Sequence, residues 1–236
     1  MSFIPLSSQI PGVSIGAWHI EEEELFFLER VKLYENEWVR LGNIEHPQKR
    51  LEWLSSRLCL KELIKIRNHS RVESLNTQSG KPYLSTNSHF ISYTHSTKYS
   101  AAIASTECEV GIDLEYLKRK RNFRTSYLWM NEAEVAFFEQ HKSHELFLLM
   151  WSAKETLYKI LGQGFAFKHN LFLDIENFEL KRNGFLPASV QKDDFHKHYL
   201  ISYQFCPEFV LTYTSDCFSP SSATIPFSKE KSKVYD

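Results

Sequence analysis

FISYTHSTKYSAAIAS at 90–105 and LISYQFCPEFVLTYTS at 200–215 are the two stretches that decide the fold. They align without a gap at an offset of 110, and the tripeptide Ile-Ser-Tyr occurs at the same place in both. The helical segment SSRLCL at 55–60 falls similarly on SAKETL at 152–157, at an offset of 97. Coincidence between short β-rich strings is the alternative explanation. A true internal repeat predicts an α+β fold, a pseudo-dimer of two similar halves, each with helices packed on an antiparallel sheet and with the ligand site at the seam.

The chain length agrees with this division. A chain of 236 residues suits one large domain or two of roughly 100 residues each. The repeat places an N-terminal α+β half at 1–108 and a C-terminal α+β half, with the metal site, at 109–216. The remaining segment, 217–236, is rich in Ser, Thr, Pro and Lys, and we expect it to be a weakly ordered tail.

Composition excludes several classes of protein. Lys and Arg together number 28 and Asp and Glu 29, a balance that argues against a partner such as nucleic acid. The longest apolar runs, such as 146–151, fall far short of the ~18 residues of a membrane span, and no signal peptide is evident. The four cysteines form no CxxC pair, and we interpret them as free thiols of a cytoplasmic protein in preference to a disulfide framework.

Periodicity predicts the elements along the chain. A strand is expected at 13–19, one helix or two short ones at 21–40, a helix at about 47–66 and a loop at 67–82. Strands at 89–95, 98–105 and 109–116 are followed by helices at about 125–140 and 143–161. Further strands are expected at about 172–180, 185–190, 196–205 and 208–215, with a hairpin turn at Asn183-Gly184.

Two carboxylates share one face of the strand at 109–116. Asp113 and Glu115 alternate with Val110, Ile112 and Leu114, so their Cα atoms are roughly 6.5–7 Å apart. Such like charges repel unless a cation or solvent separates them. On its own the pattern equally fits an exposed strand face with two solvated acids.

The helix at 143–161 presents a third acid. Its apolar stripe predicts the buried face and comprises Leu146, Met150, Ala153, Leu157 and Ile160. Trp151, Glu155 and Lys159 occupy the opposite side, one turn apart from each other. A Glu and a Lys at this spacing are most often a surface ion pair, but a solvated face seldom carries a Trp. We therefore expect this face to meet another part of the molecule or a ligand.

Together these residues suggest phosphate chemistry. Asp113, Glu115 and Glu155 are hard oxygen ligands that suit Mg²⁺, with Mn²⁺ as an alternative. Lys154 and Lys159 could neutralise a diphosphate, and further candidate cations are His95, Lys49, Arg50 and Lys81. His196 and His198 alternate on one strand and form a weaker metal candidate. The sequence has no Walker loop, GxGxxG or GxSxG motif.

The sequence resembles the 4′-phosphopantetheinyl transferases. The paired signature is GIDLE at 111–115 followed by WSAKETLYKILGQG at 151–164, and the larger monomeric type is the most similar. A basic helix at 49–57, GKP at 80–82 and THS at 94–96 occur in the family's order. The resemblance covers about 45–215, and it implies a fold of two similar α+β halves with coenzyme A between them. Thr94 stands where the family usually has Ser.

The resemblance also implies an activity. Such enzymes move the phosphopantetheine arm of coenzyme A, their co-substrate, onto a serine of an apo acyl or peptidyl carrier protein and release 3′,5′-ADP. Magnesium would be held by Asp113, Glu115 and Glu155, and Glu155 is also the candidate base. The other implied roles are catalysis by Lys154 and Lys159, and contacts to coenzyme A by these lysines and by Lys49 or Arg50, Lys81, Thr94 and His95. Glu134 matches an acidic family position whose role stays open.

Two other functions compete with this interpretation. Three carboxylates and two lysines would serve another magnesium-dependent phosphoryl or nucleotidyl transfer equally well. A non-catalytic module that binds coenzyme A or a carrier is the third reading. It is disfavoured because such a module has no need to hold like charges together. The sequence does not tell which carrier or pathway the protein would serve.

Overall fold

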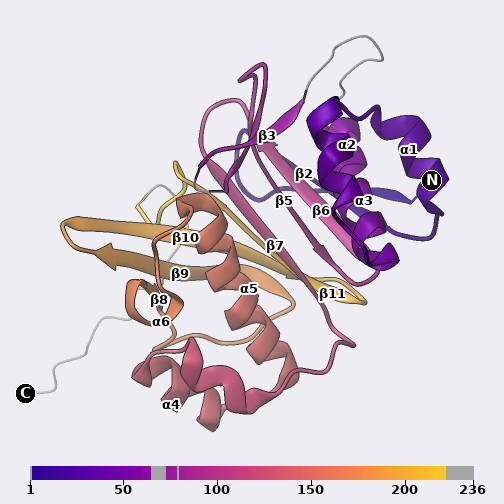
Figure 1. Ribbon diagram of the computed structural model, residues 1–236. Helices are drawn as coiled ribbons and strands as arrows, with labels where there is room; N and C mark the ends of the chain where they lie inside the picture. Colours follow the sequence, from indigo (N-terminus) through magenta and orange to yellow (C-terminus); the bar gives the residue numbers. More distant parts are fainter. Residues whose placement is uncertain (1, 65–72, 79, 222–236) are drawn as a thin grey trace, which may run out of the picture.

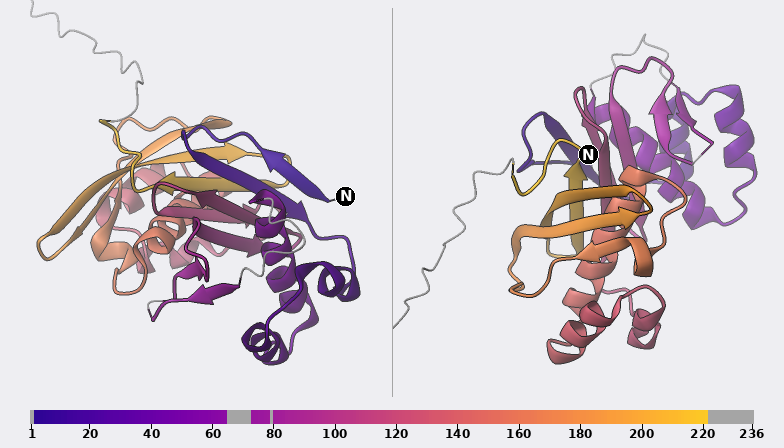
Figure 2. Two further views of the ribbon diagram at one scale, coloured as in Figure 1. Left: turned by 90° about the horizontal axis from the view of Figure 1, so that it is seen from above. Right: turned by 90° about the vertical axis from the view of Figure 1, so that its left-hand side faces the viewer.

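Two antiparallel sheets with helices packed against them form the molecule (Figures 1 and 2), which confirms the predicted α+β class. The structure is a computed structural model that describes residues 2–64, 73–78 and 80–221. No helix in these ranges is both long and apolar enough to cross a membrane. The first sheet has the strand order β1-β2-β6-β5-β4-β3, and the second has the order β7-β11-β10-β9-β8.

The first sheet and its helices come from the N-terminal part of the chain. Helix α3, which begins with Pro47 in a first-turn position that needs no N–H donor, packs its apolar side on β6 and β2. Leu54 and Leu58 of α3 are buried there against Ala102 of β6. The elements are β1 (Phe3–Leu6), β2 (Val13–His19), α1 (Glu24–Val31), α2 (Glu35–Gly42), α3 (Pro47–Leu63), β3 (Ser74–Asn76), β4 (Pro82–Leu84), β5 (Phe90–Ser96) and β6 (Tyr99–Ser105).

The second sheet and its helices follow. Helix α5 packs on β7 and β11, and all five residues of its predicted apolar stripe are buried. Its start is fixed by Ser143, whose hydroxyl accepts from the N–H of Leu146, and it ends at Gly162. The elements are β7 (Val110–Tyr116), the 3₁₀ helix η1 (Phe123–Leu128), α4 (Glu132–Gln140), α5 (His144–Leu161), α6 (Phe167–Asn170), β8 (Leu171–Leu173), β9 (Asn183–Lys192), β10 (Phe195–Phe205) and β11 (Phe209–Ser215).

Strand register repeats between the two sheets at the offsets seen in the sequence. In the first sheet Val13 of β2 pairs with Ser105 of β6, and in the second Val110 of β7 pairs with Ser215 of β11. The pairing of β5 with β6 likewise matches that of β10 with β11. Helices α3 and α5 begin at Pro47 and His144, again 97 residues apart. These matches support the predicted internal repeat.

Strands β5 and β7 belong to different sheets but lie side by side in the middle of Figure 1. β5 carries the THS motif and β7 carries the two acids. The predicted helix at 143–161 packs directly on β7 as α5. The fold therefore brings the three motifs that the sequence singled out to one place.

Three local expectations are wrong. The predicted loop at 67–82 contains β3, although residues 67–72 and 79 lie outside the described part of the chain. The strand expected at 172–180 is only β8, because the chain leaves the edge of β9 at Asp174. The predicted turn at Asn183-Gly184 lies within β9. Gly184 pairs there with Tyr203, whose ring fills the space that a Cβ would take, and the turn before β10 is at Asp193-Asp194.

The cysteine prediction is also corrected. Cys108 and Cys217 form a disulfide, whereas Cys59 and Cys206 are free. The bond joins the segment between β6 and β7 to the residues that follow β11. The inference of a cytoplasmic location loses the support it drew from four free thiols. The expected tail begins at this disulfide, and the next residue, Phe218, packs into the core; residues 222–236 lie outside the described ranges.

Candidate active site

A cavity of about 670 Å³ opens where β5, β7 and α5 meet. Its volume falls within the range of small-molecule sites, about 300–1,000 Å³. The wall contains residues from both sides of the predicted boundary at 108/109. They are Arg40, Asn43, Ile44, Trp53, Ser56, Arg57, Asn76, Tyr93, Thr94, His95, Asp113, Leu114, Glu115, Arg121, Trp151, Glu155 and Lys159.

Gly111 sets the distance between β7 and α5. A Cβ at this position would lie 2.4 Å from the carbonyl oxygen of Thr156 and 3.1 Å from Cβ of Ile160. Only the absence of a side chain lets the strand approach the helix this closely. The close approach brings Asp113 within reach of Lys159, on the same helix as Glu155.

We expect Gly111→Ala to lower both stability and activity. The methyl group would push α5 away from β7, and such overpacking costs about 1–3 kcal/mol of unfolding free energy. Urea unfolding gives the stability, and the transfer assay described below gives the activity. Gly42→Ala is the matched control, because a Cβ at Gly42 has no neighbour within 4 Å. Wild-type stability and turnover in Gly111→Ala would refute this role.

The two acids of β7 are buried and already paired with cations. Lys159 Nζ lies 2.6 Å from Asp113 Oδ1, which also accepts a hydrogen bond from Thr94 Oγ1 at 2.9 Å. Arg121 Nη2 lies 2.6 Å from Glu115 Oε1, and Ser96 Oγ donates to Glu115 Oε2 at 3.4 Å. Asp113 is 5% exposed and Glu115 6% exposed, so the alternative of two solvated surface acids is excluded.

Glu155 is the third carboxyl group in the wall of the cavity, beside Asp113 and Glu115. Burial, followed by repulsion from Asp113, raises the pKa of Glu155 to about 7, although Lys159 opposes the shift. Burial and the charge of Asp113 also raise the pKa of Glu115, against the effect of Arg121. Three carboxylates thus influence one another inside a cavity, a pattern that is typical of functional sites.

The carboxylates fit a divalent cation in their chemistry. Oδ2 of Asp113 is buried and has no hydrogen-bond partner, so the site holds a negatively charged atom that a cation would satisfy. Carboxylate oxygens are also the donors that Mg²⁺ prefers. Among the described residues, however, no group of three or more His, Cys, Asp or Glu is gathered as a ready metal site. Lys159 and Arg121 instead hold one oxygen each of Asp113 and Glu115.

Lys154 does not reach the cavity, contrary to the expectation that it contacts coenzyme A. Its side chain is fully buried, and its Nζ lies 2.6 Å from Oε2 of the equally buried Glu134. It also donates to the carbonyl oxygens of Trp129, Phe167 and Leu171, at 3.1, 2.8 and 2.8 Å. Burial lowers the pKa of Lys154, and Glu134 counteracts this. Lys154 is therefore a structural cation.

The same ion pair explains Glu134, whose role the sequence left open. Glu134 forms a capping box with Asn131 at the start of α4 and accepts from the N–H of Leu173 in β8. Through Lys154 it is connected to α5. The pair thus connects α4, α5, α6, β8 and the residue that follows η1.

Three predicted coenzyme A contacts lie away from the cavity wall. Lys49 is more than half exposed and pairs with Glu52 at 2.6 Å, while Arg50 pairs with Glu24 at 2.5 Å. Lys81 pairs with Glu109 at 2.6 Å and donates to the carbonyl of Ile160. Their charges are taken up by structural partners.

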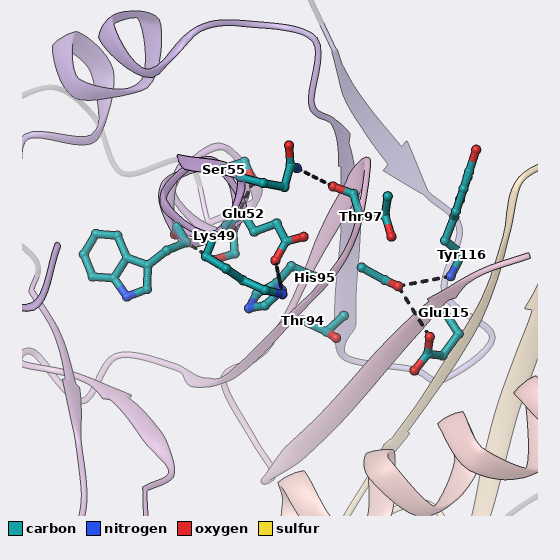
Figure 3. Close-up of polar contacts among 12 residues, drawn as sticks. Lys49, Glu52, Ser55, Thr94, His95, Thr97, Glu115 and Tyr116 are labelled. Atoms are coloured by element: carbon teal, nitrogen blue, oxygen red, sulfur yellow. Dashed lines mark hydrogen bonds and ion pairs between the residues drawn. The ribbon is translucent and has the colours of Figure 1, made fainter. Parts of the chain in front are cut away.

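His95 does line the cavity, as expected. Its Nδ1 lies 2.9 Å from Oε2 of Glu52, toward which Lys49 also turns (Figure 3). Burial would raise the pKa of Glu52, but the contacts with His95 and Lys49 lower it on balance. Glu52 therefore stays ionised and fixes the imidazole ring at the end of β5. Thr94 lies beside it on the same strand (Figure 3).

Sequence reasoning missed three arginines that line the cavity together with the expected Lys159 and His95. Arg57 is 4% exposed and stacks on Trp53 at 3.4 Å from the ring centroid, and its Nε forms an ion pair with the buried Glu37 at 3.8 Å. Arg40 and Arg121 also line the wall. The position of Arg57 on the basic helix was its only signal in the sequence. Periodicity alone does not tell which cations of that helix face the cavity.

Comparison with known proteins agrees with this geometry. Residues 109–214 match the model of the 4′-phosphopantetheinyl transferase superfamily. The family resemblance is confirmed. A protein of Synechocystis sp. that is provisionally named 4′-phosphopantetheinyl transferase is 28% identical over 170 residues, which is 66% of this chain and 67% of that protein. The superfamily match begins one residue before β7, and it includes the three acids and Lys159.

Proposed function

We propose that the protein transfers the 4′-phosphopantetheine arm of coenzyme A to a serine of an apo acyl or peptidyl carrier protein. The observation that carries the proposal is the cavity, in which Asp113, Glu115 and Glu155 lie opposite cations contributed by the other half. The superfamily match covers the acidic wall, and the THS motif supports the proposal from the opposite side of the boundary, since Thr94 and His95 line the cavity. We further propose that the protein acts as a monomer, because both walls come from one chain.

Coenzyme A has groups that suit both walls. Its diphosphate would lie against Lys159 and Arg121, near the three acids. Its 3′-phosphate and adenosine would lie toward Arg57, Arg40 and His95, which line the same cavity. This assignment replaces Lys49, Arg50 and Lys81, whose charges are paired elsewhere.

Asp113, Glu115 and Glu155 would hold the metal. A bound magnesium ion would neutralise the diphosphate and polarise the phosphorus that is attacked. To bind it, Asp113 and Glu115 would loosen their pairs with Lys159 and Arg121, which frees those two cations for phosphate oxygens. The two ion pairs offset part of the negative charge of the three carboxylates.

The transfer itself needs a base and a stabilised leaving group. Glu155, with its pKa raised to about 7, would accept the proton of the carrier serine hydroxyl. The serine oxygen forms a bond to the β-phosphorus of coenzyme A, and the bond from that phosphorus to the bridging oxygen breaks. The electron pair leaves with 3′,5′-ADP, whose new charge Lys159 stabilises.

The direct test is to incubate the protein with coenzyme A, Mg²⁺ and an apo carrier, and to weigh the carrier by mass spectrometry. We expect the carrier to gain one phosphopantetheine, and we expect EDTA to prevent the gain. No gain with any member of a broad carrier panel would contradict the proposal.

A thermal-shift comparison separates the main alternative. Another magnesium-dependent phosphoryl or nucleotidyl transferase would bind ATP, whereas we expect coenzyme A to stabilise the protein and ATP not to. Ligand at a hundred times its Kd adds about 2.7 kcal/mol, which raises the Tm of a chain of this length by roughly 5–10 °C. Arg57→Met should remove most of the shift with coenzyme A. Stabilisation by ATP of the same size would favour the alternative.

A further inference from the structure

Two buried hydroxyl groups of β5 face the two acids of β7. Thr94 Oγ1 donates to Asp113 Oδ1 at 2.9 Å, and Ser96 Oγ donates to Glu115 Oε2 at 3.4 Å. Side chains alternate along a strand, so His95, between the two hydroxyls, pairs with helix α3 instead. The hydrogen bonds therefore join alternate residues of one strand to alternate residues of the other, across the predicted boundary at 108/109.

Thr94 fixes one oxygen of the Asp113 carboxylate. Oδ1 of Asp113 accepts from Thr94 and lies 2.6 Å from Lys159 Nζ, whereas Oδ2 is buried and has no hydrogen-bond partner. Hydrogen bonds to a charged carboxylate are short and strong, so they restrict the rotation of the group. Thr94 donates from β5 and Lys159 from α5, so two different elements hold the same oxygen. The other oxygen, Oδ2, is the one available to a cation.

The same hydrogen bond argues against the contact with coenzyme A that the family resemblance implied for Thr94. A hydroxyl group has a single proton, and that of Thr94 is donated to Asp113. The proton is then not available to a phosphate oxygen of coenzyme A. The branched Cβ of threonine also restricts rotation about χ1, which keeps the hydroxyl directed at the acid. The side chain of Thr94 therefore suits a contact with a carboxylate of the protein.

Ser96 repeats the arrangement at Glu115, but more weakly. Its Oγ accepts from the N–H of Tyr116 at 3.2 Å, and the dashed lines that end at Glu115 and Tyr116 in Figure 3 mark its two contacts. The proton of the hydroxyl is left for Glu115, although 3.4 Å is long for a hydrogen bond between two oxygens. Oε1 of Glu115 is held separately by Arg121. Ser96 thus contributes less to the orientation of its acid than Thr94 does.

We propose that Thr94 is a positioning residue for the divalent cation: it holds Oδ1 of Asp113 and leaves Oδ2 free to bind the metal. Ser96 assists in the same way at Glu115. The inference rests on the proposed function, which assigns these acids to the metal. Loss of a hydrogen bond to a metal ligand lowers the affinity for the metal. Loss of a direct contact with coenzyme A would instead lower the affinity for coenzyme A, even without metal.

The test compares two variants of the full chain: Thr94→Val removes the hydroxyl and keeps the branched shape, and Thr94→Ser keeps the hydroxyl. With saturating coenzyme A and no carrier, the EPR signal of free Mn²⁺ gives the Kd for this cation. We expect Thr94→Val to raise this Kd about tenfold or more, and Thr94→Ser to restore most of the affinity. The Kd for coenzyme A in EDTA, measured by calorimetry, should stay at the wild-type value. In the transfer assay, the KM for Mg²⁺ should rise more than kcat falls.

Ser100→Ala is the matched control, because Ser100 of β6 is also buried and its hydroxyl has no hydrogen-bond partner. We expect a wild-type Kd for Mn²⁺ in this control, and in Ser96→Ala a rise smaller than in Thr94→Val. Ser96→Ala is an independent test if thermal unfolding finds that Thr94→Val does not fold. Wild-type affinity for Mn²⁺ in both test variants, an equal loss in the control, or weaker binding of coenzyme A in EDTA would overturn the positioning role and leave the proposed function intact. A wild type that binds coenzyme A but no divalent cation would overturn both.

Discussion

Replacing Asp113 by Ala is expected to abolish transfer, and Glu155→Ala should have the same effect. Each variant removes a proposed ligand of the divalent cation, and Glu155→Ala also removes the proposed base. We expect turnover to fall about a thousandfold or more. The protein should stay folded, because the lost pairing of Asp113 with Lys159 is offset by relief of repulsion among the three carboxylates. Mass spectrometry of the carrier measures the transfer, and thermal unfolding checks the fold.

Glu145→Ala provides the matched control for these variants. Glu145 is on α5 like Glu155, but its side chain is 48% exposed and pairs with Arg182 on the surface. We expect wild-type transfer and little change in Tm. Wild-type turnover in Asp113→Ala or Glu155→Ala would remove that residue from the site.

Lys154→Met is expected to cause the largest loss of stability. The variant leaves the carboxylate of Glu134 buried without its cation, and breaking such a pair costs about 3–5 kcal/mol. For a chain of this length, the Tm should fall by roughly 6–20 °C. Adding Glu134→Gln removes the unpaired charge and should recover part of the loss. Thermal unfolding of the single and double variants measures both effects.

Lys142→Met is the comparison for this second prediction. Lys142 pairs with Glu139 at the surface, both about half exposed, and we expect a change of less than about 1 kcal/mol. At a temperature where Lys154→Met is folded, its turnover should fall much less than that of Asp113→Ala. A normal Tm together with abolished transfer would instead make Lys154 a catalytic residue, as the family resemblance first implied.

The sequence predicted the arrangement of the acids because side chains two positions apart in a strand, or about 3.6 apart in a helix, lie on the same face. Asp113 and Glu115 had to share a face of β7, and Glu155 had to oppose the apolar stripe of α5. The repeat at an offset of 110 then indicated that β5 and β6 have counterparts in β10 and β11 of a second half. For these residues, local pattern and tertiary structure agree.

The cations could not be assigned in the same way. Lys154 was misplaced because a lysine next to a catalytic position looks like a phosphate ligand until its buried partner, Glu134, is known. Lys49, Arg50 and Lys81 pair with acids outside the cavity wall. Arg57 and Arg121 are also paired with acids, but their side chains line the cavity. Which cation pairs with which acid is decided by packing between elements, and periodicity contains no information on it.

The matched register of the two sheets has a consequence for the number of sites. At the offset of 97, Asp113, Glu115 and Glu155 correspond to Gly16, Trp18 and Leu58. Trp18 and Leu58 are buried in the core, and the space beside Gly16 is filled by the ring of Phe3. At the matching positions the N-terminal part thus has packed side chains in place of the three acids, and it contributes Arg40, Arg57 and His95 to the wall of the cavity. On the proposed function, the two predicted halves contribute different walls to one site, and we expect one coenzyme A to bind per chain.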